Sequence, residues 1–347
     1  MELIKIDKKA WAGGLEKLSA SYALYGPVKE QHFCNFRALE KGEAPDLSGL
    51  NSRLSPKGVV FPQSQVMFTY TVDENQAEHH ILQEAGEKAS DRAVIGIRPC
   101  DAAAFLMVKQ NFDTPEFKDP YWLKAYEATV KVGLACNDPC QSCFCTSTGC
   151  GPFSETGLDV LLADTGDFFL ARALTDRGEH FLKTAGWNQA AEADPLDSMK
   201  KKAEEKIVSA VSTEHLKDKK TTDLFDAPFW EEVAFACINC GTCTYVCPTC
   251  WCFDIQDEVQ GNSGVRMRNW DSCMYPLFTL HGSGHNPRDK KPQRVRQRFM
   301  HKLKYFVDRY DGGIQCVGCG RCVRLCPVNI DIRTVCELMN NYELSQC

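Results

Sequence analysis

The pattern of apolar and polar residues predicts a mixed α/β region over the first 185 residues. KGVVFPQSQVMFTY, which begins at Lys57, alternates enough to be rich in strands, and AVIGI at 93–97 reads as a short buried strand. The run AAAFLMV at 102–108 follows as a helix, and VKVGLA at 130–135 is another strand. DVLLAD and DFFLARAL are separated by TG, which predicts a β-hairpin. We therefore expect a sheet with flanking helices in this half.

The second half reads as mainly helical. The charged stretch 195–220 favours a connecting helix, because its apolar residues recur every four positions: Met199, Ala203, Ile207 and Val211. Cysteine density rises from 237 onward, so we expect an α/β (α+β) N-terminal domain over 1–190. A helical linker is expected over 191–230 and an α-helical ferredoxin domain over 231–347.

Composition narrows the class of protein. The 347 residues are 44% hydrophobic, which suits two globular domains with a core. The N-terminal MELIKIDKKAWAGGLEKL lacks the apolar stretch of a signal peptide, and the longest apolar run, 102–108, is too short to span a bilayer. We expect a cytoplasmic protein without direct membrane insertion. The net charge of -6 argues against binding to nucleic acid.

Twenty cysteines are the most informative feature of the composition. Without an export signal these thiols stay reduced, so they indicate metal binding more than disulfides. Two runs, CINCGTCTYVCP at 237–248 and CVGCGRCVRLCP at 316–327, share the C-x2-C-x2-C-x3-C-P spacing of bacterial ferredoxins. This repeat predicts two [4Fe-4S] clusters.

The spacing also predicts which cysteines bind each cluster. Three thiolates two residues apart wrap one cubane, and the fourth, before proline, ligates the other cluster. The first cluster would take Cys237, Cys240, Cys243 and Cys326, and the second would take Cys316, Cys319, Cys322 and Cys247. The alternative is a pair of structural zinc sites, but these usually use paired CxxC units or histidine. Gly241, Gly318 and Gly320 lie where the backbone must wind tightly around the ligands.

The residues 248–315 between the two runs must fold by themselves. QRFMHKLKYFVDRY places apolar residues at helical spacing, and RNWDSCMYPLF is apolar on one side, so we expect helices around the clusters. The helical residues in question are Phe299, Leu303, Phe306 and Tyr310. The segment 288–304 is strongly basic, which fits either a solvated face or cations that offset cluster charge or dock an acidic partner.

A third group of cysteines lies in the N-terminal half. Cys100 in GIRPCDAAAF stands where a strand passes into a helix, which Asp101 is expected to cap. Five more cysteines crowd into one loop and predict a third cluster: Cys136, Cys140, Cys143, Cys145 and Cys150. The first three have the C-x3-C-x2-C spacing of radical SAM enzymes, so a catalytic iron-sulfur enzyme is the alternative. Too little sequence precedes them for several barrel units.

Several motifs together resemble one family over about 250 residues. The motifs are RPCDAAAF, CFCTSTG, CINCGTCTYVCPTCWC, RNWDSCM, GSGHNPR and QCVGCGRCVRLCP. They resemble the iron-sulfur β-type subunits, which are 4Fe-4S dicluster proteins. The family includes the corresponding iron-sulfur component of anaerobic sulfite reductase and the β subunit of cytosolic NiFe hydrogenases of the sulfhydrogenase type. Related proteins serve heterodisulfide-reductase-linked complexes.

The resemblance implies an electron-transfer component of a larger oxidoreductase complex in anaerobic metabolism. Electrons would pass between a flavoprotein partner that binds FAD and NAD(P)H and a separate catalytic subunit. The resemblance also implies that Cys100, Cys136, Cys143 and Cys145 ligate the third [4Fe-4S] cluster. Cys140 and Cys150 depart from the family pattern, and an exchange with Cys140 stays open.

The remaining candidates are not expected to bind metal. Cys250, Cys252 and Cys273 read as buried thiols beside the clusters, because the eight ligands of the two runs are complete without them. Outside the ligand sets stand Cys34, Cys336, Cys347, His281 and His285. No GxGxxG or GxxxxGK[ST] motif and no catalytic constellation stands out, so we expect a relay component and not the site of bond-making chemistry.

Overall fold

An eight-stranded sheet forms the centre of the N-terminal half. The computed structural model describes residues 2–31, 33–85, 90–310 and 313–343. The strand order is β10 (Gln189–Ala190), β1 (Leu3–Asp7), β9 (Phe168–Ala173), β8 (Val160–Asp164), β7 (Thr129–Leu134), β6 (Arg92–Ile97), β2 (Ala23–Glu30) and β3 (Phe33–Ala38). The neighbours β2, β6, β7 and β8 run parallel, and the outer pairs are antiparallel. The sheet is open, with β10 and β3 at its edges.

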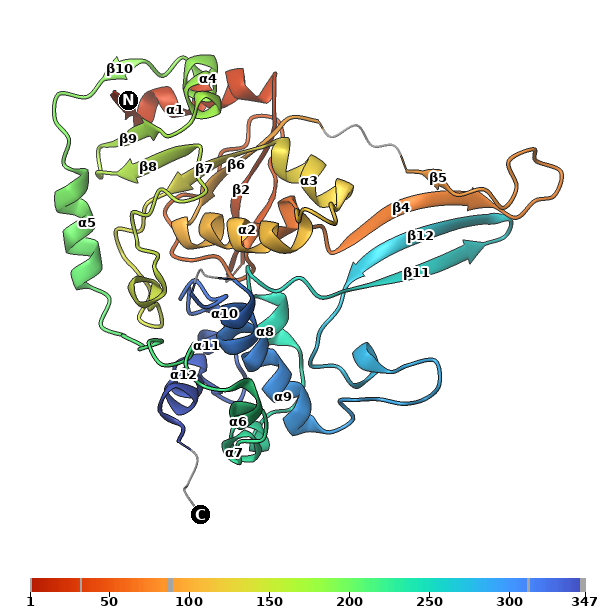
Figure 1. Ribbon diagram of the computed structural model, residues 1–347. Coiled ribbons are helices and arrows are strands. Elements are labelled where there is room, and N and C mark those ends of the chain that lie inside the picture. Colours follow the sequence, from red (N-terminus) through yellow and green to blue (C-terminus); the bar gives the residue numbers. More distant parts are fainter. Residues whose placement is uncertain (1, 32, 86–89, 311–312, 344–347) are drawn as a thin grey trace.

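Helices cover both faces of this sheet (Figure 1). α1 (Lys8–Ser19) and α4 (Asp176–Ala185) pack on one face, and α2 (Pro99–Phe112) and α3 (Pro120–Glu127) pack on the other. Central strands are buried on both sides: Ile95 of β6 belongs to one core, and Val94 belongs to the other. The expected strands at 93–97 and 130–135, the helix at 102–108 and the β8–β9 hairpin are confirmed.

A second sheet forms an arm that projects from the body (Figure 1). It is antiparallel, in the order β11 (Phe253–Gln260), β12 (Ser263–Trp270), β4 (Ser64–Thr71) and β5 (Gln83–Glu84). The arm therefore combines strands from the N-terminal half with a hairpin from between the two cysteine runs. The expected helix at RNWDSCMYPLF is wrong, because this segment ends β12 and continues into the 3-10 turn η3 (Pro276–Thr279).

Short helices make up most of the regular structure in the C-terminal half. They are α5 (Leu196–Glu205), α6 (Thr221–Phe225), α7 (Phe229–Phe235), α8 (Thr242–Tyr245), α9 (Lys291–Met300), the π-turn η4 (His301–Tyr305), α10 (Phe306–Arg309), α11 (Arg321–Arg324) and α12 (Ile332–Asn341). The 3-10 turns η1 (Pro56–Val59) and η2 (Cys145–Thr148) lie in the N-terminal half. Trp230, Phe299, Leu303 and Met339 belong to a separate apolar core here.

Two helix predictions have different outcomes. The helical spacing of Phe299, Leu303 and Phe306 is confirmed, since all three are buried on α9, η4 or α10. Tyr310 was also expected on this helix, but it lies just beyond the end of α10 in an extended conformation. The connecting helix is shorter than expected, because α5 ends at Glu205 and the next residues contain isoleucine, valine and serine, which are weaker helix formers. Among the described helices, none has the length and apolar character needed to cross a bilayer.

Candidate metal centres

The first cysteine run encloses a cavity together with one cysteine from the second run. Cys237 and Cys240 line this cavity from the loop that leads into α8, Cys243 lines it from α8 itself, and Cys326 lines it from the turn after α11. The cavity thus brings together the four thiols expected for the first cluster. Cys322 lines the same cavity, although it was expected to serve the second cluster.

The four thiols expected for the second cluster also lie near one another. Burial raises the pKa of the Cys322 thiol, and the charges of the other three members, Cys247, Cys316 and Cys319, raise it further. Cys247 contacts the Thr249 hydroxyl at 3.3 Å. This set lies between the other two sites, because Cys322 faces the first cavity and Cys319 faces the third.

The third group of cysteines lines a cavity at the start of α2. Cys100 contributes from the first turn of α2, and Cys136, Cys143 and Cys145 contribute from the loop after β7. The four thiols that the resemblance implies as ligands therefore come together. Cys319 of the second run also lines this cavity.

Cys140 and Cys150 occupy different positions at this third site. Cys140 lines the cavity and accepts a hydrogen bond from Arg324 at 3.1 Å. A hydrogen bond from Cys143 lowers the pKa of Cys140 to about 5, so these two thiols are direct neighbours. Cys150 is not among the cavity-lining residues, and its thiol lies near the Gly151 carbonyl at 3.9 Å. Cys140 thus remains the structural alternative to Cys143.

The second and third sites touch through their backbones. Phe144 N donates a hydrogen bond to Gly318 O at 2.9 Å. Gly318 has a φ of +61°, and a Cβ on it would lie 2.5 Å from Cys145 N. A Cβ on Gly320, at φ +69°, would lie 2.6 Å from Ser142 O. Glycine at both positions permits the left-handed backbone and this close approach of the two cysteine loops.

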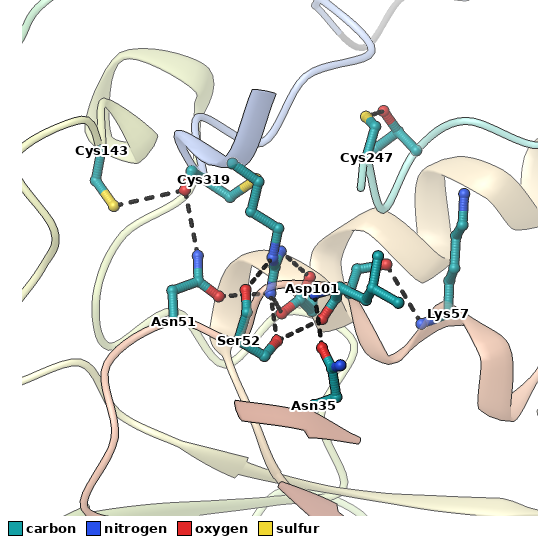
Figure 2. A network of polar contacts seen from close by, with 12 residues as sticks. Asn35, Asn51, Ser52, Lys57, Asp101, Cys143, Cys247 and Cys319 are labelled. Carbon is teal, nitrogen blue, oxygen red and sulfur yellow. Dashed lines mark hydrogen bonds and ion pairs between the residues drawn. The ribbon is translucent and has the colours of Figure 1, made fainter. Parts of the chain in front are cut away.

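A buried ion pair links α2 to the second cysteine run. Arg321 and Asp101 are fully buried, and the guanidinium forms two bonds of 2.6 and 2.7 Å to the carboxylate. Figure 2 shows Asp101, Ser52 and Asn51 gathered beside Cys319. Arg321 also bonds Ser52 O at 3.0 Å, and Asn51 donates to Cys319 O at 3.2 Å. The expected capping role of Asp101 is wrong, because α2 has no side-chain cap and the carboxylate is used in this pair.

Buried cations lie among the cysteines of the first two sites. Arg298 is 2% exposed, donates to Cys243 O at 3.1 Å and lines the first cavity. Lys302, also 2% exposed, lies near enough to Cys247 for that thiol to raise its pKa against the opposing effect of burial. For these two residues of the basic segment, the structure favours the charge-offsetting interpretation over a solvated face. Lys304 serves differently, since it is buried and donates to Leu216 O at 2.9 Å.

Several of the buried thiols need a cation to lose their protons. Burial raises the pKa of Cys145 and of Cys316 to about 12, and it raises that of Cys100 well above its usual value. Metal binding is the ordinary way in which such a thiol becomes a thiolate. Backbone amides already contact sulfur, since Asn239 N and Ile330 N donate to the Sγ atoms of Cys237 and Cys326 at 3.4 and 3.2 Å. Arg298 and Lys302 also lie where they would stabilise the negative charge of thiolates. The donor set therefore fits [4Fe-4S] clusters.

The other candidates lie apart from these three sites. His281 and His285 are exposed, and their rings meet edge-on with centroids 5.3 Å apart. Cys336 is buried in the helical core, Cys34 lies beside β2, and Cys347 falls outside the described residues. Among the described residues, no three His, Cys, Asp or Glu side chains converge tightly enough for a single metal ion.

Sequence reasoning missed the residues that join the sites. Arg321 and Asp101 are 220 positions apart, and no pattern pairs them. Arg298 lay within a basic segment whose members looked alike in sequence, although only some of them point inward. In the sequence, only the glycines within the second cysteine run, Gly318 and Gly320, indicated that another backbone segment would pack closely against it.

Sequence comparisons identify the proteins that this chain resembles. Residues 236–330 match the family described as a 4Fe-4S dicluster domain. The chain is 28% identical over 341 residues to the sulfhydrogenase 2 subunit beta of Pyrococcus furiosus, covering 95% of this chain and 96% of that protein. No solved structure matches the chain. These matches confirm the resemblance to the iron-sulfur β-type subunits and the assignment as an iron-sulfur electron-transfer subunit.

Proposed function

We propose that this iron-sulfur electron-transfer subunit holds three [4Fe-4S] clusters in a row and connects a flavin- and NAD(P)H-binding partner to a catalytic subunit. FAD would be carried by the partner. The first cluster would bind to Cys237, Cys240, Cys243 and Cys326. The second would bind to Cys316, Cys319, Cys322 and Cys247. The third would bind to Cys100, Cys136, Cys143 and Cys145.

The continuity of the three sites carries this proposal. The second set of thiols shares Cys322 with the wall of the first cavity and Cys319 with the wall of the third. Bound clusters would supply one-electron transfer, which needs close spacing and little rearrangement. The chain's own residues hold the sites together through the Asp101–Arg321 pair and the Phe144–Gly318 hydrogen bond.

The surroundings of the first site support contact with a partner there. Cys240 is exposed, and the nearby apolar side chains of Phe235 and Ile238 are 85% and 63% exposed. Exposed apolar side chains beside a redox site favour the docking of another protein of the complex. Two observations support the partner classes: the similar Pyrococcus protein is a β subunit of a sulfhydrogenase, and this sequence lacks a dinucleotide motif.

Anaerobic purification followed by metal analysis and Mössbauer spectroscopy tests the proposal. We expect a brown protein with at least about twelve irons per chain and little zinc, since each cubane holds four irons. Cys326→Ser should remove the first cluster's signal and leave the others, whereas Cys34→Ser should change none of them. A protein that contains zinc and lacks cubane signals after reduction would refute the relay, and binding of SAM to the isolated chain would favour a catalytic role.

A further inference from the structure

Another cavity lined by several cysteines lies at the base of the arm. Its wall includes Cys250, Cys252 and Cys273, none of which belongs to the three sets above. The first two lead from the first cysteine run into β11, and Cys273 follows β12. Pairing of the hairpin brings the two ends together, and Asp271 N donates to Cys252 O at 3.0 Å. The arm thus gathers thiols that are far apart in the sequence.

These three thiols form one group next to the second site. Cys250, Cys252 and Cys273 share the wall of one cavity, where the thiols of Cys252 and Cys273 shift each other's pKa in opposite directions. Cys250 N donates a hydrogen bond at 3.4 Å to the carbonyl oxygen of Cys247, which we assign to the second cluster. Packing alone does not require three thiols to share the wall of one cavity with charged and amide side chains.

Buried donors without acceptors belong to two residues that line the same cavity, one of which, Arg298, also lines the first cavity. Gln315 and Arg298 both line the cavity and are each 2% exposed. The Nε2 of Gln315 and the Nε and Nη1 of Arg298 have no hydrogen-bond partner within the described structure. Unsatisfied buried donors are costly, so an acceptor is expected beside them. Sulfide and thiolate sulfurs of a cluster are acceptors of this kind.

The charge balance around the cavity also calls for an anion. Arg288, Arg298 and Lys302 line it, and the Lys57 ammonium donates to Cys250 O at 3.0 Å. Across the described ranges, none of Lys57, Arg298 and Lys302 forms an ion pair with a carboxylate. Buried cations are usually paired, and a thiolate-ligated cluster with its net negative charge would provide the counterion.

The helix beside the cavity is distorted where it meets these thiols. α9 passes into η4, a π-helix of one turn that begins at His301. Such turns occur frequently at functional sites because they redirect side chains. The imidazole of His301 lines the cavity and packs edge-on against Trp251, with ring centroids 5.9 Å apart. It provides a fourth side chain able to bind a metal.

We propose that this cavity holds a fourth iron-sulfur cluster, bound by the thiolates of Cys250, Cys252 and Cys273 and by His301. Among the described residues, no group of three or more potential ligands is close enough together to bind a single metal ion. This holds for the three thiols and the imidazole here, and also for the predicted ligand sets of the other sites. A cubane is larger than one ion and is held by ligands spread around it. A histidine ligand favours a higher reduction potential than four thiolates, so this cluster would accept electrons from the second site.

Alkylation mapping of the native holoprotein tests this without any mutation. The fourth-cluster proposal depends on the proposed function in one respect, namely that the chain is isolated with its iron-sulfur clusters bound. Under anaerobic conditions Cys250, Cys252 and Cys273 should resist iodoacetamide as strongly as Cys243, and all should react after acid and chelator remove the iron. Cys34 is the free-thiol control. Labelling of Cys252 and Cys273 in a brown protein with about twelve irons would overturn the fourth cluster and leave the relay intact.

Iron content and hyperfine spectroscopy give the second test. The native chain should hold about sixteen irons, and Cys252→Ser should lower this by about four, whereas Cys34→Ser should not. Electron-nuclear double resonance of the reduced native protein should show a nitrogen coupling that disappears in His301→Ala. Absence of that coupling in the native protein would refute ligation by His301. Absence of every cubane signal would instead refute the relay itself.

Discussion

The junction between the second and third sites and the projecting arm are built by opposite means. At the junction, Asp101 and Arg321 are fully buried and Gly318 lies against the backbone of the neighbouring cysteine loop. In the arm, β11 is exposed along almost its whole length, with Ile255 and Val259 47% and 55% exposed. Residues at the junction therefore have no room to move, whereas those near the arm's tip face solvent.

This difference indicates where sequence changes are expected to matter. At the junction, an added methyl group would clash with the neighbouring backbone, and removal of one charge would leave the other buried and unpaired. Water cannot reach the junction to reduce either cost. An ion pair on the arm loses little when broken, because solvent replaces it. The arm's base, where Arg268 is 2% exposed, should be intermediate.

Removing one partner of the buried ion pair should have the largest effect. Asp101→Ala leaves Arg321 charged and buried, which should lower the free energy of unfolding by about 4 kcal/mol. Anaerobic urea unfolding measures this. The double variant Asp101→Ala with Arg321→Met removes both charges and should recover most of the loss. Equal stability of Asp101→Ala and the unaltered chain would contradict a structural role for the pair.

A methyl group at the contact between the cysteine loops should come next. Gly318→Ala places a Cβ 2.5 Å from Cys145 N at a φ of +61°, so the loops must separate. We expect a loss of about 3 kcal/mol and an altered electron paramagnetic resonance signal from the third site. Gly313→Ala is the matched control, because its φ is also positive but no atom lies within 4 Å of the added Cβ. If both variants lost a similar amount of unfolding free energy, the effect would come from backbone strain alone and not from the contact with Cys145.

The base of the arm should respond less. Arg268 bonds Asp119 at 2.6 Å and Gln65 at 2.7 Å, and its guanidinium lies over the ring of Phe61. Arg268→Ala should cost about 2 kcal/mol, since the partly exposed Asp119 carboxylate can be rehydrated. Arg268→Lys should restore only part of this, because an ammonium lacks the planar fork. A cost above that of Asp101→Ala would reverse the proposed ranking.

The smallest effect is expected on the outer part of the arm. Arg266 and Asp257 are bonded at 2.7 Å across the hairpin but are both more than a third exposed. Arg266→Ala should leave the urea midpoint and the cluster spectra within measurement error, because water replaces the lost contact. A large shift would show that the arm's tip contributes to the folded body after all.

The sequence was enough to predict most of the α/β half. Strands such as β6 and β7 and the helix α2 were recognisable because a buried strand or helix shows its burial in a local apolar pattern. The arm was not predicted. β11, with the sequence FDIQDEVQ, is largely exposed to solvent and carries little periodic signal. Its strand conformation therefore depends on pairing with β12, which in turn pairs with β4 from the other half of the chain.

The cysteine spacings by themselves determined that this protein would carry iron-sulfur clusters, because the wrapping of a cubane imposes a fixed local repeat. Only the tertiary structure decided how the sites are joined. The Asp101–Arg321 pair, the approach of Gly318 to Cys145 and the gathering of Cys252 with Cys273 are contacts between segments distant in sequence. Such contacts leave no local period, since they depend on how the elements pack and not on how any one of them winds.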